Sequence, residues 1–164
     1  MPFRVCFVCS GNICRSPTAE AVLRRQLAEA GLDGQVVVDS AGLGDWHVGA
    51  DTDHRAAAAL RQRGYPAWEH RARQFRASDF AERDLVVALD SGHERSLRAL
   101  APTAADRDKV RLLRSYDPAA AAGRGELDVP DPYYGGAAGF EHVLDLVEAA
   151  CRGLLDEVRA AGAA

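Results

Sequence analysis

The chain has 164 residues, enough for one domain of ordinary size with a sizeable apolar core. Apolar residues make up 48% and charged residues 27% of the sequence, values near the average for globular proteins, which excludes fibrous and wholly disordered chains. The formal net charge is −4 and the sequence pI is near 5.7, so the chain lacks the cationic field of a nucleic-acid or membrane-surface binder. We therefore expect neither nucleic acid nor a membrane as a partner.

Apolar patterning predicts alternating strands and helices. Short runs rich in Val, Leu and Phe are typical of strands buried on both faces, and apolar residues at intervals of three or four are typical of helices that cover a sheet. Pro17 in the first turn and Gly31 after the last turn mark the ends of the first helix. In chain order, the predicted elements are a strand at 3–9, a helix at 17–30, a strand at 36–38, a glycine-rich loop at 40–51, a helix at 54–63, a strand at 85–89, a helix at 94–101, a strand at 110–116, a loop at 117–134 and a helix at 139–161.

This alternation predicts an α/β fold with a mostly parallel sheet, formed by a single domain that spans residues 1–164. In such sheets, ligands bind beyond the carboxyl ends of the strands, at a switch point in strand order. We therefore expect the chemistry in the loops that follow Cys9, Ser40, Leu89 and Tyr116.

The four cysteines are too few and too unevenly placed for a disulfide scaffold, because Cys6, Cys9 and Cys14 lie near the N-terminus and Cys151 is distant. The apolar start of the chain is too short for a signal peptide, and no apolar run approaches the roughly 20 residues of a transmembrane helix. These features predict a cytoplasmic protein with reduced thiols. Cys6 and Cys151 lie on apolar faces and are expected in the core.

The segment from Cys9 to Pro17 connects a predicted strand to a predicted helix. A loop in that place aims several backbone N–H groups and a helix N-terminus at one point, which creates an anion site. Gly11 and Asn12 tolerate the left-handed backbone of a tight loop. The positive concavity favours the thiolate form of Cys9, and the planar guanidinium of Arg15 can bind two oxygens of an oxyanion.

Two motifs, one near each end of the chain, resemble the signatures of the low-molecular-weight protein tyrosine phosphatases. The first is VCSGNICRSP at residues 8–17, followed by Ala19 and Glu20, and the second is DVPDPYYG at residues 128–135. The resemblance spans essentially the whole chain. It implies a four-stranded parallel, Rossmann-like sheet with helices on both faces. It also implies hydrolysis of phosphotyrosine in proteins and of small aryl phosphates.

The resemblance implies roles for individual residues. Cys9 is the expected nucleophile, Arg15 binds the phosphoryl group, and Asp131 is the general acid and base. The other residues expected to bind substrate are Ser10, Gly11, Asn12, Ile13, Cys14, Ser16, Trp46, Tyr133 and Tyr134. Ser16 is also expected to stabilise the thiolate. The residues expected to support the loop from behind are Ser40, Glu20 and His70, the last two as a buried pair.

The implied mechanism is covalent. The thiolate attacks phosphorus in line, protonated Asp131 supplies a proton to the leaving phenolate, and its carboxylate then activates water to hydrolyse the phosphocysteine. No metal or other cofactor is expected, and the five histidines show no close metal-ligand spacing. The expected partners are phosphotyrosine-containing proteins, and the expected oligomeric state is a monomer or weak dimer.

Some residues have a second interpretation. Asp128 is an alternative to Asp131 as the acid. Cys14 either forms a reversible disulfide with Cys9 under oxidation, which would make the enzyme redox-sensitive, or is a passive loop residue. Ser10 departs from the family pattern, because many members carry an apolar residue or Thr there.

A run of arginines follows His70 and also has two interpretations. A solvated basic face is favoured over a surface that steers phosphopeptides. The run comprises Arg71, Arg73 and Arg76.

The sequence favours phosphotyrosine hydrolysis over three other functions. A thiol-dependent arsenate reductase needs two further cysteines, and the sequence has none between Cys14 and Cys151. A protein arginine phosphatase would carry Thr in place of Ile13 and would lack the paired tyrosines. A phosphate-binding module without catalysis would have lost the nucleophile, the arginine or the acid, and all three are present.

Overall fold

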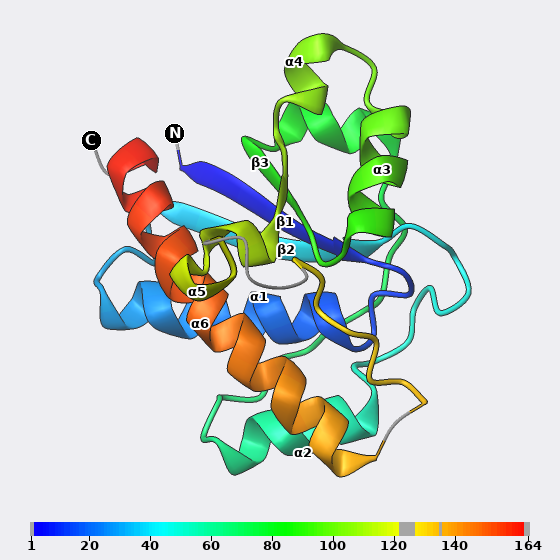
Figure 1. The fold of residues 1–164 in the computed structure, drawn as a ribbon, viewed down its shortest axis with the longest axis vertical. Coiled ribbons are helices and arrows are strands. Elements are labelled where there is room, and N and C mark those ends of the chain that lie inside the picture. Colours follow the sequence, from blue (N-terminus) through cyan, green and yellow to red (C-terminus); the bar gives the residue numbers. More distant parts are fainter. Residues whose placement is uncertain (1, 122–126, 135, 163–164) are drawn as a thin grey trace.

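Four apolar runs pair into one parallel sheet in the computed structural model, which describes residues 2–121, 127–134 and 136–162 (Figure 1). The strand order is β2-β1-β3-β4. The strands are β1 (Phe3–Cys9), β2 (Val36–Gly42), β3 (Leu85–Ala88) and β4 (Val110–Leu112). The predicted α/β fold with a four-stranded parallel sheet is therefore confirmed.

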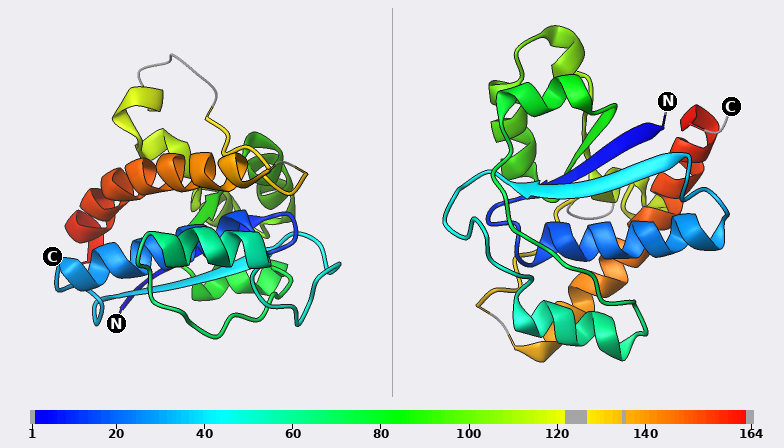
Figure 2. Two further views of the ribbon diagram at one scale, coloured as in Figure 1. Left: turned by 90° about the horizontal axis from the view of Figure 1, so that it is seen from below. Right: turned by 180° about the vertical axis from the view of Figure 1, so that it is seen from behind.

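Helices cover both faces of the sheet (Figure 2). One face carries α1 (Arg15–Glu29), α2 (His54–Gln62) and α6 (Ala137–Gly162), and the other carries α3 (Ser91–Leu100) and the short α4 (Ala104–Arg107). Alternate side chains of β1 serve the two cores: Val5 and Phe7 pack on the side of α1 and α6, and Cys6 and Val8 on the side of α3. Although α6 has 26 residues, neither it nor another described helix carries an apolar stretch long enough to cross a membrane.

The strand β2 continues further than the sequence predicts. Its parallel pairing with β1 extends to the partners Cys9 and Gly42, so Ser40 lies inside the strand and the glycine-rich loop starts later than expected. Close approach of two backbones allows this, because a Cβ atom on Gly42 would lie 2.8 Å from the carbonyl oxygen of Ser10.

The segment after β3 also differs in detail from the prediction. Pairing with β3 ends at Leu112, so the expected strand 110–116 is wrong beyond that residue, where a 3₁₀ turn η2 (Leu113–Tyr116) follows. The expected loop at 117–134 begins with a short helix α5 (Pro118–Ala121), whose Ala119 amide donates to Asp117 at 3.0 Å. Residues 122–126 of that loop lie outside the described residues. A second 3₁₀ turn, η1 (Ala77–Glu82), precedes β3 and was not predicted.

The topology brings the carboxyl ends of the strands to one edge of the molecule. The order β2-β1-β3 places a switch point beside β1, and the loop from β1 to α1 emerges there. The start of β1 and the end of α6 lie near each other at the opposite end (Figures 1 and 2). The edge at which the sequence predicts chemistry is therefore shared by the loops after β1, β2 and β3.

Candidate active site

The sulfur of Cys9 lies at the N-terminus of α1, where backbone N–H groups have no partner within the helix. The amide of Ser16 donates to this sulfur at 3.4 Å, and the Ser16 hydroxyl lies 3.0 Å from it. The side chain of Cys9 is buried, with 3% exposed. These donors and the positive end of α1 stabilise a negative charge on the sulfur.

Asn12 holds the loop in its bend. Its backbone has a left-handed φ of +59°, and its side chain is fully buried. The carboxamide nitrogen donates to the hydroxyls of Ser16 and Ser40, both at 2.9 Å, and its oxygen accepts from the Arg73 amide at 3.0 Å. The backbone oxygen of Asn12 lies 2.7 Å from Nε2 of His70. Because both ends of the carboxamide are engaged, it cannot turn without breaking a hydrogen bond.

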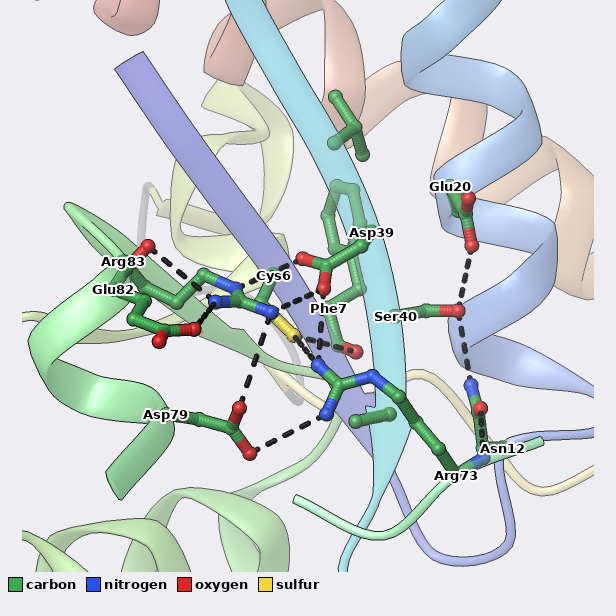
Figure 3. A network of polar contacts seen from close by, with 12 residues as sticks. Cys6, Phe7, Asn12, Glu20, Asp39, Ser40, Arg73, Asp79, Glu82 and Arg83 are labelled. Carbon is green, nitrogen blue, oxygen red and sulfur yellow. Dashed lines mark hydrogen bonds and ion pairs between the residues drawn. The ribbon is translucent and has the colours of Figure 1, made fainter. Parts of the chain in front are cut away.

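Glu20 and His70 are buried and support the loop around Asn12 from behind. Figure 3 shows the contact of Glu20 with Ser40. The Ser40 hydroxyl donates to Glu20 at 2.7 Å, and Arg24 forms an ion pair with the other carboxylate oxygen at 2.6 Å. Burial raises the pKa of Glu20, although the Ser40 hydrogen bond and the Arg24 charge oppose the shift. Glu20 and His70 therefore reach Asn12 by different routes, the first through Ser40 and the second directly.

Arg15 is anchored on one side and open on the other. Its Nη1 donates to the carboxylate of Asp90 at 2.9 Å and to the carbonyl oxygen of Val129 at 3.0 Å. Its Nη2 lies 3.8 Å from the carboxylate of Asp131. Only 5% of the Arg15 side chain is exposed, so these contacts fix the guanidinium before any ligand binds.

Asp90 comes directly after β3 and also caps α3. Its carboxylate accepts from the His93 amide at 2.8 Å. Although partial burial raises the pKa of Asp90, the His93 hydrogen bond and charge and the contact with Arg15 lower it below its ordinary value. Asp90 therefore stays a carboxylate that holds Arg15 in place.

A cavity of about 370 Å³ opens above the Cys9 sulfur. Its floor is the loop between β1 and α1, and its upper walls are aromatic. The lining residues are Cys9, Ser10, Gly11, Ile13, Cys14, Arg15, Trp46, His47, Asp131, Tyr133 and Tyr134. Apolar walls above an anion-binding floor suit a flat ring that carries a phosphate group.

The predicted aromatic residues occupy the rim of this cavity. Trp46 is 71% exposed and Tyr134 is 92% exposed, so neither is a core residue. The rings of Tyr133 and Tyr134 lie edge to face with centroids 5.0 Å apart, and the guanidinium of Arg55 lies 5.3 Å from the centre of Tyr133. Gly135, the last residue of the second motif, lies outside the described residues.

Asn12 and Ser16, which were predicted to bind substrate, lie at the back of the loop. Both side chains are fully buried behind the loop and do not line the cavity. They act instead on the neighbours that do, because Asn12 holds Ser16 and Ser16 contacts Cys9.

The two candidate acids have different surroundings. Asp131 lines the cavity, with 49% of its side chain exposed, and accepts a hydrogen bond from the Tyr133 amide at 3.0 Å. Asp128 accepts from the amide of Ser91 at 2.8 Å, at the start of α3, and does not line the cavity. The geometry therefore favours Asp131 as the group that meets a ligand.

Three site residues were missed by the sequence analysis. Asp90 lies in the loop directly after β3, one of the loops expected to carry chemistry, so its position in the sequence could have identified it. The ring of His47 lies against Gly11: a Cβ atom added to Gly11 would lie 2.7 Å from the His47 ring. His93 lies with Nε2 2.9 Å from the Ser10 hydroxyl, a contact that no sequence spacing announces.

The four cysteines are free thiols. Cys6 and Cys151 are fully buried in the two cores, as expected. Cys14 is buried beside the cavity, and burial, together with the negative charges of Asp53 and Cys9, raises its pKa to about 12. Among the described residues, no group of three or more histidine, cysteine or acidic side chains could hold a metal ion.

Comparison with known proteins gives a consistent result. The family model described as low molecular weight phosphotyrosine protein phosphatase matches residues 4–164. A low molecular weight protein-tyrosine-phosphatase of Streptomyces coelicolor is 61% identical over 159 residues, which are 97% of this chain and 95% of the relative.

Two solved structures have a similar fold. A protein tyrosine phosphatase from Entamoeba histolytica has a TM-score of 0.89 at 33% identity, covering 97% of this chain and 98% of that one. A Drosophila arginine phosphatase has a TM-score of 0.84 at 32% identity, covering 94% of this chain and 97% of that one. Overall fold alone therefore does not separate these two activities.

The buried imidazole of His93 makes stability depend on pH. Burial lowers the pKa of His93 from 6.5 to about 4, against the opposing charge of Asp90 and with a contribution from Arg15. Between these two values the unfolded chain binds a proton at His93 that the folded chain does not, so the free energy of unfolding falls as the pH falls. From pH 7 to pH 5 this residue should account for about 2 kcal/mol of the fall.

Replacing His93 by Gln, which keeps a polar partner for Ser10 but does not titrate, should reduce that fall by about 2 kcal/mol. Urea unfolding at pH 7 and pH 5 measures it. His142 is exposed, so His142→Gln is the matched control and should behave as the wild type. An unchanged fall in His93→Gln would contradict the prediction.

Proposed function

Because the chain belongs to the low molecular weight phosphotyrosine protein phosphatase family and is a protein-tyrosine phosphatase, we propose that it hydrolyses phosphotyrosine through a phosphocysteine intermediate on Cys9. One observation carries the proposal. A buried thiol lies among hydrogen-bond donors at a helix N-terminus, below a cavity that Arg15 and Asp131 also line. We also propose that residues 1–164 form one phosphatase domain, with phosphotyrosine proteins and small aryl phosphates as substrates.

In the first step, the phosphate of the substrate binds on the loop amides and on Arg15. The Cys9 thiolate attacks phosphorus in line, a sulfur–phosphorus bond forms, and the bond from phosphorus to the phenolic oxygen breaks. Arg15 and the amides stabilise the charge on the equatorial oxygens. Because Asp90 and Val129 already hold Nη1 of Arg15, little reorganisation is needed when the phosphate binds.

Asp131 is the proposed proton donor to the leaving phenolate. Its carboxylate lies 3.8 Å from Nη2 of Arg15, the guanidinium that we propose binds the phosphate. Protonated Asp131 therefore lies beside the proposed phosphate site, where a positioned carboxylic acid can transfer its proton to the leaving oxygen.

In the second step, the phosphocysteine is hydrolysed. Having lost its proton, Asp131 accepts one from a water molecule, which attacks phosphorus and releases the Cys9 thiolate and inorganic phosphate. The hydroxyl of Ser16, 3.0 Å from the sulfur, and the Ser16 amide stabilise the thiolate as it leaves. The same contacts therefore serve the attacking sulfur and the departing sulfur.

The walls of the cavity favour an aromatic phosphoester over phosphoarginine. Ile13, Trp46 and Tyr133 present apolar surface above the phosphate site, where a phenyl ring can pack. A guanidinium group would lose hydration there without a carboxylate dedicated to it, because Asp131 is assigned to the reaction itself.

Replacing Cys9 by Ser should abolish turnover of an aryl phosphate, because an alkoxide does not form at neutral pH at this position. Release of inorganic phosphate from p-nitrophenyl phosphate and from a phosphotyrosine peptide measures it, with free phosphoarginine as a third substrate. Cys151→Ser, which changes a buried thiol in the core, is the matched control and should remain active. Turnover by Cys9→Ser at the wild-type rate, or a wild type that prefers phosphoarginine, would sink the proposal.

Asp131→Asn should lower kcat/KM according to the leaving group. For phenyl phosphate, whose leaving group needs a proton, we expect a loss of about 10²-fold or more, and for p-nitrophenyl phosphate a much smaller one. Measuring kcat/KM across a series of substituted phenyl phosphates gives the dependence. Asp128→Asn is the control in the same segment and should keep the wild-type dependence, because its carboxylate binds Ser91. Equal losses for all esters would show that Asp131 is not the acid.

We further propose that Cys14 protects Cys9 from irreversible oxidation, since both thiols line one cavity. Peroxide oxidises the Cys9 thiolate to a sulfenic acid, and the Cys14 thiol then displaces water to form a disulfide, which an added dithiol reduces. After peroxide and dithiothreitol, wild type should recover most of its activity and Cys14→Ala much less. Cys151→Ala serves as the control, and equal recovery in the wild type and Cys14→Ala would contradict this role.

A further inference from the structure

The arginine run after His70 is not a uniform solvated face. Arg71 fits that interpretation, because its side chain is 62% exposed and pairs with Glu69 on the surface. Arg73 does not, since Figure 3 shows it folded back onto the edge of the sheet, between β2 and η1. Its side chain is 36% exposed and does not line the cavity.

Two carboxylates hold the guanidinium of Arg73. Its Nη2 lies 3.0 Å from Asp39, in the middle of β2, and its Nη1 lies 3.3 Å from Asp79, in η1. Arg83 contacts the same two carboxylates, with Nε 3.1 Å from Asp39 and Nη2 4.0 Å from Asp79. Arg83 also forms an ion pair with Glu82 at 3.6 Å. We call the two arginines and the two aspartates the Arg73 clamp.

The backbone of Arg73 joins the active-site loop to the end of β2. Its amide donates to the side-chain oxygen of Asn12 at 3.0 Å, and its carbonyl oxygen accepts from the Gly42 amide at 2.8 Å. Residues 65–73 form neither helix nor strand. Backbone hydrogen bonds of Ala72 with Gly49 and Ala50, both at 2.8 Å, hold the segment next to Arg73, and the Arg73 side chain adds an anchor at the edge of the sheet.

We propose that Arg73 is a positioning residue for the reaction of Cys9, an inference that rests on the proposed function. The clamp fixes the Arg73 side chain, the fixed segment keeps its amide on Asn12, and Asn12 keeps the Ser16 hydroxyl on the Cys9 sulfur. Figure 3 shows the part of this route that runs from the clamp to Asn12. Loss of the clamp loosens the donor to a carboxamide that already holds a left-handed backbone.

The energetics favour a role in positioning over a role in global stability. Ion pairs that are about one-third exposed contribute little to the free energy of unfolding. Arg83 remains on Asp39 and Asp79 when Arg73 is changed, so no carboxylate is left without a partner. Small displacements of reacting groups, in contrast, reduce rates strongly.

The test compares Arg73→Met, Arg73→Lys and the control Arg71→Met. The readouts are kcat/KM for p-nitrophenyl phosphate, the midpoint pH of Cys9 alkylation by iodoacetamide, and the midpoint of thermal unfolding, with Cys9→Ser as the alkylation blank. Arg73→Met should lower kcat/KM about tenfold and move the alkylation midpoint upward, with little change in thermal unfolding. Arg73→Lys should restore part of both effects, and Arg71→Met should match the wild type.

A second background tests the route through Asn12. Asn12→Gly removes the carboxamide but accommodates the left-handed backbone. If Arg73 acts through Asn12, adding Arg73→Met to Asn12→Gly should change kcat/KM less than about twofold. A full tenfold loss in that background overturns the route.

Two further outcomes overturn the role of Arg73. One is a wild-type alkylation profile and kcat/KM in Arg73→Met, and the other is a lower thermal midpoint with an unchanged alkylation profile. Failure of the proposed function looks different, because the wild type would then show no turnover, or Cys9→Ser would remain active. The two failures are therefore distinguishable in one set of measurements.

Discussion

The contact of the Cys9 sulfur with the amide and hydroxyl of Ser16 at the start of α1 is the interaction on which the proposed chemistry depends. A thiolate next to a helix N-terminus gains from the unpaired amides and from the helix dipole, and a bound phosphate gains from the same groups. The sheet supplies the position, since β1 ends at Cys9 and α1 begins at Arg15 with only a short loop between them. The topology therefore places the Cys9 sulfur, the amides at the start of α1 and the Arg15 guanidinium at one edge of the molecule.

The bend of the loop requires an unfavourable backbone conformation and buried polar groups, and hydrogen bonds from neighbouring residues offset these costs. Asn12 has a positive φ and a fully buried carboxamide, and it has hydrogen-bond partners at each end of that carboxamide. Arg15 brings a buried positive charge, and its guanidinium donates hydrogen bonds to the carboxylate of Asp90 and to the carbonyl oxygen of Val129. In this arrangement of the loop, the buried polar groups of Asn12 and Arg15 have hydrogen-bond partners.

The supports come from elements far apart in the sequence. Ser40 reaches the loop from β2, His70 and Arg73 from the segment that follows α2, and Asp90 from the end of β3. A parallel sheet makes this convergence possible, because the carboxyl ends of its strands meet at one edge. The cavity lies in front of the loop, and the buried side chains of Asn12, Ser16 and Ser40 lie behind it.

Local features of the sequence predicted much of this structure. Apolar runs located the four strands, helical periodicity located the long helices, and the Cys9 and Asp131 motifs located the cavity. The sequence did not reveal the extension of β2 to Gly42, which depends on register with β1 and on a close backbone approach.

The roles of Asp90, His93 and Arg73 also escaped prediction, since each is defined by a partner many residues away in the chain. Arg73 is the clearest case: from its neighbours it resembles a solvated arginine, and only its contacts with Asp39 and Asn12 distinguish it from Arg71.

The measurement that tests the central claim most directly is rapid acid quenching during turnover of an aryl phosphate, followed by mass spectrometry of the intact protein and its peptides. The account predicts a transient species heavier by one phosphoryl group, with the added mass on the peptide that carries Cys9. Phosphoryl transfer to another residue, or steady turnover with no phosphorylated protein under conditions that make the second step slow, would contradict it.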